Sequence, residues 1–272
     1  MVRNTKVLAL TFAVLAAAAN PNWAGAVALT GTSYFQDFNS LGTFDAPGEG
    51  LPDGWSVRTG ATGSYLGDVQ SFSADVKAWD RINGGFANYA SIGTDARGAT
   101  GAERDDRASI QARVENRALG IRPVDQNNAT FPGSDPGAAF VFQIDNTLGL
   151  GNFELNVDLL LLTTRNRNIN WLVQYGIGVT PTEFVTVGGV NTFDDLNEWG
   201  SSNHAFYFPE EMNNVDDYVW IRIVTLGESV GSGRRDTFAI DNFHLTYSAV
   251  PEPASLSILG LGAVALISRR RK

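Results

Sequence analysis

One short motif in the chain has the residue types of a nucleophilic active site. Residues 227–231 (GESVG) match the G-x-S-x-G pattern, in which a sharp strand-to-helix turn exposes a reactive serine hydroxyl. The pattern has catalytic meaning only in that context, and here a Gly- and Arg-rich run and another alternating apolar run follow it. The sequence therefore predicts that Ser229 lies in a flexible hairpin loop rather than at a catalytic turn.

Acids and histidines are the other residues with catalytic potential. Adjacent acids occur at 105–106, 194–195, 210–211 and 216–217. A glycosidase needs two carboxyl groups about 5 to 9.5 Å apart across a cleft, and sequence neighbours on a strand face opposite sides. His204 stands in a polar stretch without an evident acid partner, and His244 lies among apolar residues as a packed or rim residue. We therefore predict no catalytic site; the alternative is a secreted glycan-acting hydrolase whose acids converge only in the fold.

Tryptophans are the candidates for contact with sugar rings. Trp171 and Trp220 lie in alternating apolar runs, so they are predicted to be in the core. Trp79 and Trp199 are flanked by Asp, Asn, Gly and Ser, and they are the predicted glycan contacts. The alternative for each of these two is that the ring holds its own loop in place.

The elements that would position these residues are short alternating runs separated by Gly, Asn, Asp, Ser and Thr. They predict roughly ten strands and no helix, which is typical of an antiparallel sandwich. The predicted strands are 33–38, 55–59, 86–93, 108–114, 138–144, 153–163, 171–177, 184–187, 205–208, 218–226 and 237–247.

Three local features refine this picture. The last two predicted strands are expected to pair as a hairpin across residues 227–236. The run 159–162 is continuously apolar, so both faces of its strand are predicted to be covered. Residues 93–107 are rich in Gly, Ala, Asp and Arg, and they are predicted to form a long surface loop.

The N-terminal residues have the pattern of a secretory signal peptide. Arg3 and Lys6 precede a 13-residue apolar run, and small residues end at Ala26. The run is shorter than the ~20 residues needed to span a bilayer, so signal peptidase is predicted to cut after Ala26 and to leave a single domain at 27–249.

Composition excludes several partners for the exported part. Residues 27–250 contain 28 acids and 14 basic residues, a net charge of −14. This charge argues against nucleic acid and anionic membranes as partners. The chain has no cysteine and only two histidines, which excludes thiolate zinc sites and leaves calcium, with its hard oxygen ligands, as the plausible metal.

The C-terminal tail consists of a rigid motif, an apolar run and a basic cluster. Pro251, Glu252 and Pro253 form an extended stretch. The apolar run 254–267 would be ~21 Å long as a helix, against a hydrocarbon core of ~30 Å. The cations that follow can reach the cytoplasmic interface and leave the body outside. This basic cluster consists of Arg269, Arg270, Arg271 and Lys272.

The tail, residues 250–272, resembles the PEP-CTERM sorting signal of Gram-negative bacteria. The resemblance implies a C-terminal transmembrane helix, and cleavage at Pro251 to Pro253 by an exosortase, an integral-membrane cysteine transpeptidase. It also implies a host that makes exopolysaccharide and biofilm.

The body also resembles the jelly-roll-type and lectin-like sandwiches often found ahead of this signal. The residues that carry this resemblance are 35–39 (FQDFN), 51–55 (LPDGW), 117–120 (RALG) and 239–243 (AIDNF). In many such folds the first and last strands lie together, which implies that Asp37 and Asp241 meet and provide calcium ligands. The alternative is that Asp241 caps a turn or forms a hydrogen bond with the backbone at the start of the final strand.

Together these observations predict an exported all-β protein with a jelly-roll-like β-sandwich body. Its expected course is transient anchoring in the inner membrane, processing by an exosortase, and a final location on the cell surface or in the matrix. The expected role is structural or carbohydrate-binding, with exopolysaccharide as the candidate partner, and no cofactor other than calcium is predicted.

Overall fold

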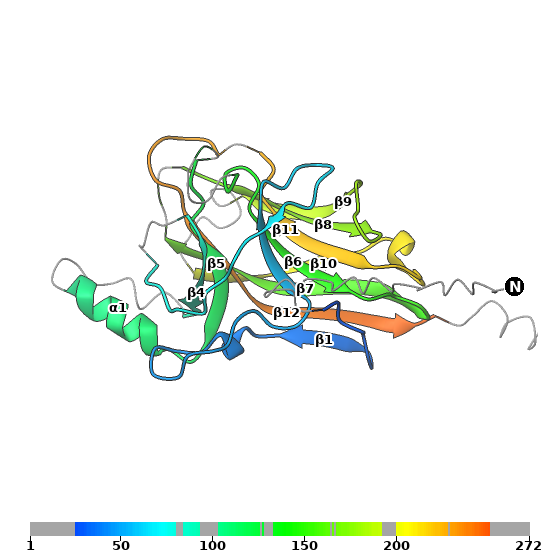
Figure 1. Cartoon of the computed structure of the whole chain (residues 1–272), viewed down its shortest axis with the longest axis horizontal. Helices are drawn as coiled ribbons and strands as arrows, with labels where there is room; N and C mark the ends of the chain where they lie inside the picture. The colour runs from blue at the N-terminus through cyan, green and yellow to red at the C-terminus, as the bar shows by residue number, and fades with distance from the viewer. Residues whose placement is uncertain are drawn as a thin grey trace, which may run out of the picture.

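The protein is described here by a computed structural model, which is 48% strand and 6% helix (Figure 1). The helix α1 (Glu103–Arg113) and the 3-10 turns η1 (Asn39–Leu41) and η3 (Glu210–Met212) accompany the strands. The predicted signal peptide up to residue 24, Trp199 and the whole tail from Pro251 lie outside the described residues. The described residues are 25–79, 84–92, 103–125, 127, 133–163, 165, 167–191, 200–227 and 229–250, with the backbone alone at 103–107, 191 and 200.

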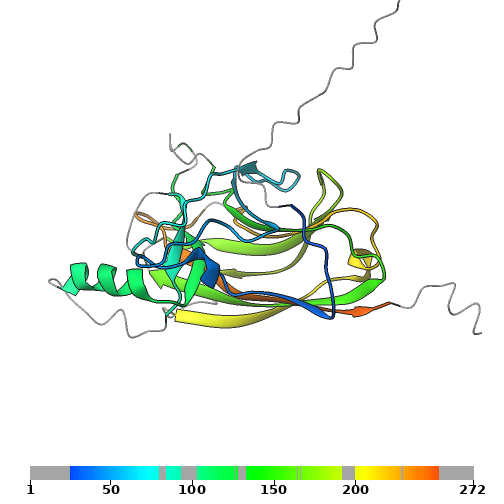
Figure 2. The same cartoon turned by 60° about the horizontal axis from the view of Figure 1, so that its bottom comes forward.

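Two antiparallel sheets face each other and form the predicted jelly-roll-like sandwich (Figure 2). The first sheet has the order β3 (Asp68–Val69), β2 (Trp55–Thr59), β6 (Ala139–Ile144), β11 (Val219–Val224), β8 (Asn170–Ile177) and β9 (Val185–Asn191). The second has the order β10 (Gly200–Tyr207), β7 (Leu150–Thr163), β12 (Thr237–Ala249), β5 (Arg117–Ile121) and β4 (Phe86–Ala90), and β1 (Ser33–Gln36) pairs with β12.

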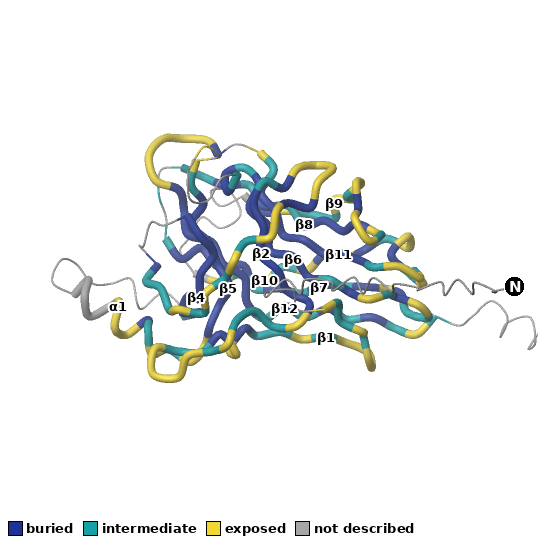
Figure 3. Tube along the Cα trace, viewed as in Figure 1, coloured by how far each residue is buried: buried dark blue, intermediate teal, exposed yellow. Residues whose placement is uncertain are grey.

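Aromatic residues fill the space between the sheets, where Figure 3 shows the buried stretches of the chain. The ring of Trp171 from the first sheet stacks on Phe238 of the second with centroids 4.4 Å apart. Trp171 is 1% exposed in this core, whereas Trp220, 2% exposed, is buried in a separate cluster with Leu66 and Val141, so both are buried as predicted but not in the same core. Strand β7 shows the reason, because residues 153–158 alternate between buried inward positions and half-buried outward positions.

A second, smaller cluster covers half of the outer face of the second sheet. Trp79 packs there on Leu160 and Leu162, while Leu159 and Leu161 point into the main core. Both faces of this part of β7 are therefore covered, as the continuous apolar run predicts. Figure 3 shows the same region as a dense group of buried segments near β4 and β5.

The predicted strand at 108–114 is wrong, because residues 103–113 form α1. The predicted loop 93–107 is wrong for residues 103–107, which belong to this helix, and residues 93–102 lie outside the described residues. The apolar alternation misleads here: Ile110 is 58% exposed, whereas the polar Gln111 is buried and accepts a hydrogen bond from the backbone of Trp79. The helix end is held by Arg117, whose Nη1 donates to the carbonyls of Gln111 and Val114 at 2.8 and 3.0 Å. These donors satisfy carbonyls that a helix end otherwise leaves unpaired.

The predicted hairpin between the last two strands is also wrong. Strand β11 pairs with β6 and β8 in the first sheet, whereas β12 pairs with β7, β5 and β1 in the second. The chain between them therefore crosses from one sheet to the other. Alternation shows that each segment is a strand, but the partner is decided by which neighbour buries its apolar face.

Strand β5 is absent from the sequence prediction although all five of its residues are buried. Its first residue, Arg117, is charged, and it contains Gly120; both residue types are untypical of a buried strand. A Cβ at Gly120 would lie 2.7 Å from the Cβ of Ala239 and 2.8 Å from the ring of Tyr89, so the close approach of β12 requires glycine here.

Candidate functional site

On the other half of the outer face of the second sheet, no such cluster is formed by the part of the chain that the structure describes. We call this half the open face. There β1, β12, β7 and β10 lie side by side, and their registers place outward side chains in rows. The first row holds Phe35, His244, Asn156 and Ala205, and the second holds Ser33, Thr246, Glu154 and Tyr207. Asp158 and Asn203 continue the face beside the first row.

Two exposed aromatic side chains stand at opposite edges of the open face. Phe35 on β1 is 56% exposed and Tyr207 on β10 is 68% exposed. Their neighbours along the strands, among them Tyr34 and Phe206, pack in the main core, so both rings point outward. The ring of Phe35 meets His244 edge to face, with centroids 5.7 Å apart. The face therefore has an apolar platform at each side.

Polar groups occupy the two central strands between these platforms. Asn156 Nδ2 donates to Glu154 Oε1 at 3.0 Å. Asp158 accepts hydrogen bonds from the side chains of Asn203 and Asn242 at 2.9 and 2.8 Å. The positions of the open face include two carboxylates and neither Lys nor Arg, so the face carries negative charge and many hydrogen-bonding groups.

Asp241 lies directly opposite Asp158 in the ladder between β12 and β7, so the two side chains are on the same side of the sheet. It is fully buried, its Oδ1 accepts the backbone N–H of Asn242 at 2.7 Å, and its Oδ2 has no hydrogen-bond partner. Burial raises the pKa of Asp241 from 3.8 to about 7, and the charges of Asp158 and Asp37 add to the rise, while hydrogen bonds from Ser91 and Asn242 oppose it. Near pH 7 the carboxyl of Asp241 is therefore protonated in a much larger fraction of molecules than an ordinary aspartate.

The first and last strands do lie together, since β1 pairs with β12, and the charge of Asp37 acts on Asp241. The carboxylate of Asp37, however, accepts both the backbone and side-chain N–H groups of Asn39 at 3.0 and 2.9 Å. Within the ranges that the structure describes, no group of three or more His, Asp or Glu side chains is arranged to hold a metal ion. The arrangement is thus a network of hydrogen bonds around two acids.

The predicted glycan contact at Trp79 does not fit the structure. Its side chain is 4% exposed, its Nε1 donates to the carbonyl of Ala90, and its own carbonyl accepts hydrogen bonds from Arg122 and Thr237. Its polar sequence neighbours suggested a surface loop, but the segment folds back over the second sheet. Trp199 lies outside the described residues.

Phe35 and Tyr207 take the place of these tryptophans, and the sequence prediction missed them as contact residues. Both lie in predicted strands, where an aromatic residue is most often part of a core. The alternation of Tyr34 with Phe35 and of Phe206 with Tyr207 is the pattern that could have separated inward from outward rings. Exposure itself depends on which half of the sheet is covered.

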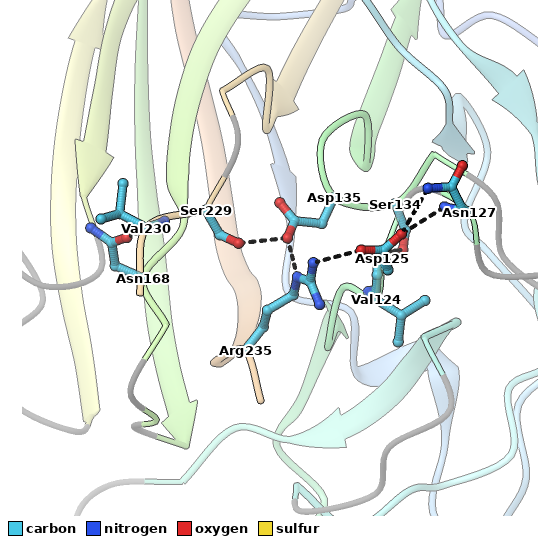
Figure 4. A network of polar contacts seen from close by, with 9 residues as sticks. All are labelled: Val124, Asp125, Asn127, Ser134, Asp135, Asn168, Ser229, Val230 and Arg235. Atoms are coloured by element: carbon cyan, nitrogen blue, oxygen red, sulfur yellow. Dashed lines mark hydrogen bonds and ion pairs between the residues drawn. The ribbon is translucent and has the colours of Figure 1, made fainter. Parts of the chain in front are cut away.

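Ser229 of the G-x-S-x-G pattern is nearly buried in a structural network (Figure 4). Its Oγ donates to Asp135 Oδ2 at 2.7 Å, and the same carboxylate oxygen binds Arg235, which also faces Asp125 at 3.9 Å. The network contains no histidine, and the next element after the serine is strand β12 rather than a helix. The network holds the crossing between the two sheets against the loop that contains Asp135, in place of the predicted hairpin loop.

The predicted acid pairs and histidines that the structure describes lie on separate segments of the fold, while residues 194–195 and the side chains of 105–106 lie outside the described part of the chain. Glu210 and Glu211 form the turn η3 and are exposed. His204 lies on β10, where its Nε2 is 2.8 Å from Ser202 Oγ, and not in a loop. His244 is a half-buried residue of the open face, as predicted.

An open pocket of about 580 Å³ lies between residues 25–28 and residues 34–36 of β1. Asp53 is the one carboxylate among its lining residues, whereas a glycosidase requires two. The predicted signal peptidase cut after Ala26 would also remove part of its wall. This pocket is therefore not the cleft that the hydrolase alternative requires.

The last strand leads directly into the predicted processing motif. Ala249 still pairs with Leu150, and the backbone N–H of Val250 donates to the carbonyl of Gly149 at 2.8 Å. Pro251 is the next residue of the chain. Of the helices that the structure describes, none is long and apolar enough to cross a membrane, and the predicted membrane helix lies outside the described residues.

Comparisons with known proteins identify the tail. Residues 249–272 match the PEP-CTERM protein-sorting motif, which confirms the predicted resemblance. No curated protein matches the chain.

Similar solved structures include three proteins of low sequence identity. Xylanase10C from Cellvibrio japonicus in complex with xylopentaose matches at 10% identity and TM-score 0.39, over 75% of this chain and only 29% of that protein. The xylan-binding module CBM15 matches at 10% identity and TM-score 0.41, over 75% and 97% of the two chains. A Stig cyclase, Fisc, from Fischerella sp. TAU matches at 12% identity and TM-score 0.42, over 81% and 99%.

Proposed function

From the PEP-CTERM sorting motif and the open face, we propose that this chain is an exported, non-enzymatic glycan-binding protein displayed at the cell surface or in the extracellular matrix. Signal peptidase would release the body after Ala26, and an exosortase would process the tail at Pro251 to Pro253. The basic cluster at the C-terminus would hold the tail in the inner membrane until that step. The partner would be exopolysaccharide of the host.

The observation that carries glycan binding is the composition of the open face. Exposed aromatic rings at its two edges offer flat apolar surfaces, and the strands between them offer carboxylate, amide and hydroxyl groups. Few precisely oriented polar groups among apolar surfaces are what a small-ligand site uses to orient a ligand. A sugar has the matching composition, with an apolar ring face and many hydroxyl groups at its edge.

A non-catalytic role is supported by what the polar clusters do. Ser229, the one serine in a nucleophile pattern, is tied to Asp135 and Arg235 in a network that joins two loops. The two carboxylates of the open face, Glu154 and Asp158, lie in one row along β7. Each accepts hydrogen bonds from asparagine side chains. We propose that these groups bind and orient a ligand and that the protein does not transform it.

Binding can be tested with the chain from Val27 to Lys272, solubilised in a mild detergent and applied to an array of purified bacterial and plant glycans. Retention that is lost in Tyr207→Ala, but kept in Tyr65→Ala, is the expected result. Tyr65 is the matched control because it is also exposed, at 44%, and lies in the loop before β3 rather than on the open face. Absence of binding to every glycan would refute the proposed function.

Sorting is tested separately in the native host. Deletion of Arg269 to Lys272 is expected to release the protein or leave it misplaced, since those cations hold the tail at the cytoplasmic interface. Cell fractionation and immunoblotting of surface protein measure the outcome. Surface display at the unmodified level would contradict the proposed role of the tail.

A further inference from the structure

The spacing of the two aromatic platforms limits what the open face can bind. Phe35 and Tyr207 are separated by the two central strands β12 and β7 and by two positions along the strands. With about 4.8 Å between neighbouring strands and about 3.4 Å per residue along them, the two Cα atoms are about 16 Å apart. A single sugar ring can stack on only one of these platforms.

The groups between the platforms form a continuous polar track. Phe35 is followed across the sheet by His244 and Asn156, and Tyr207 is preceded by Thr246 and Glu154. These residues provide donors and acceptors on successive strands without a large apolar side chain between the two edges. Such a track fits a chain of hydroxyl-bearing rings better than a protein surface, whose interface cores are mostly apolar.

Charge restricts the class of ligand further. Glu154 and Asp158 are the charged side chains on the described open face, and the exported body carries a net charge of −14. A polymer of uronic acids or sulfated sugars would bring like charges to these carboxylates, which costs affinity at low salt. An uncharged chain meets no such repulsion, and its hydroxyl groups can donate hydrogen bonds to both carboxylates.

We propose that the open face binds an extended, uncharged oligosaccharide that runs across β1, β12, β7 and β10, with Phe35 and Tyr207 stacking on rings at its two ends. This inference rests on the proposed glycan-binding function and adds the class, the charge and the minimum length of the ligand. The two aromatic residues are the ends of the site, and the polar track between them forms hydrogen bonds with the hydroxyl groups of the intervening rings.

The test is isothermal titration of the chain 27–272 with neutral gluco-, xylo- and manno-oligosaccharides, from monosaccharide to octasaccharide, and with oligogalacturonates of the same lengths. Affinity for at least one neutral series is expected to rise with length and then level off once both platforms are occupied. Oligogalacturonates are expected to bind much more weakly at low salt. Phe35→Ala and Tyr207→Ala are each expected to lower the affinity for the octasaccharide about tenfold and to weaken its dependence on length.

Matched controls separate this result from damage to the fold. Phe44→Ala and Tyr65→Ala remove exposed aromatic rings, 64% and 44% exposed, that lie outside the open face, and they are expected to leave affinity unchanged. Thermal unfolding of all four variants reports whether each one folds.

The failures of the two proposals can be told apart. If neutral glycans bind but a disaccharide binds as well as an octasaccharide, or if the two face variants bind like wild type, the extended site is refuted and glycan binding stands. Equal or tighter binding of oligogalacturonates would refute the uncharged ligand class. If no glycan of any series binds to the folded protein, the proposed function itself is wrong and this inference falls with it.

Discussion

Replacement of Asp241 by Asn should change the free energy of unfolding in a pH-dependent way: relative to wild type, the variant should become more stable as pH rises, and the net effect should be stabilising above about pH 7. Asp241 is fully buried opposite Asp158, and burial raises its pKa from 3.8 to about 7. In the unfolded chain the same group loses its proton near its usual value. Between these two values the folded protein holds a proton that the unfolded chain has released, so folding stability falls as pH rises. Asparagine cannot ionise, and its Oδ1 can still accept the N–H of Asn242.

The size of the effect follows from the two pKa values. The difference between 3.8 and about 7 corresponds to roughly 4 kcal/mol in the free energy of unfolding once pH exceeds 7. At pH 5 the same relation gives less than half of that value, and near pH 3.8 it gives almost nothing. The new amide of Asp241→Asn adds an offset, because a buried N–H without an acceptor costs about 1 to 3 kcal/mol. That offset is the same at every pH, so the slope isolates the ionisation of Asp241.

The assay is urea unfolding of the chain 27–272 and of its Asp241→Asn variant, followed by tryptophan fluorescence at several pH values between 4.5 and 8. The difference in free energy of unfolding between the two proteins should increase steadily up to about pH 7 and then level off. Asp145→Asn is the control for a general loss of negative charge, because Asp145 is exposed and lies at the end of β6.

Two outcomes would refute this reasoning. A difference that stays constant between pH 4.5 and 8 would mean that Asp241 ionises equally easily in the folded and unfolded chains. If the variant instead becomes less stable relative to wild type as pH rises, the charged carboxylate of Asp241 is stabilised in the folded protein, for example by a bound cation.

Three further predictions concern other parts of the fold. Arg117→Met should lower the free energy of unfolding by about 3 kcal/mol, because it leaves the Asn88 side chain and the helix-end carbonyls without donors; thermal unfolding measures it, and a loss under about 1 kcal/mol would contradict the capping role. A Gly-Ser spacer inserted after Val250 should speed tail processing in the native host, because the strand is hydrogen-bonded up to that residue; equal rates of product formation on immunoblots would contradict this. Ser229→Ala should cost about 1 kcal/mol through the lost bond to Asp135 and leave ester hydrolysis at background; a drop in measurable esterase activity would show that the serine is catalytic.

Much of the secondary structure could be predicted because a strand with one buried face repeats every two residues. The limits of strand β2 were predicted in full, and the burial of Trp171 between the sheets follows from the same alternation, whereas Trp220 is buried in a separate cluster. Helix α1 was missed because its residues 108–113 happen to alternate in polarity, while its end is held by Arg117 from outside the helix. Pairing partners were missed because alternation is the same for a hairpin and for a crossing between sheets.

The candidate site was less predictable than the fold. Trp79 has the sequence neighbours of an exposed loop residue, yet its carbonyl is bound by Arg122 and Thr237, which are distant in sequence. Phe35 and Tyr207 have the sequence neighbours of core residues, yet they point outward. In each case the burial of a side chain depends on segments that meet it only in the folded chain.

By itself the sequence determined the sorting motif and the strands, because the motif depends on residues 250–272 alone and alternation depends on neighbours two positions apart. Only the tertiary structure decided which half of the second sheet is covered and which rings share the open face. It also decided that the last strand ends at Ala249, two residues before Pro251, with a final backbone hydrogen bond from Val250. The physical reason is that alternation assigns a residue to one side of a strand, whereas exposure on that side depends on which distant part of the chain packs over it.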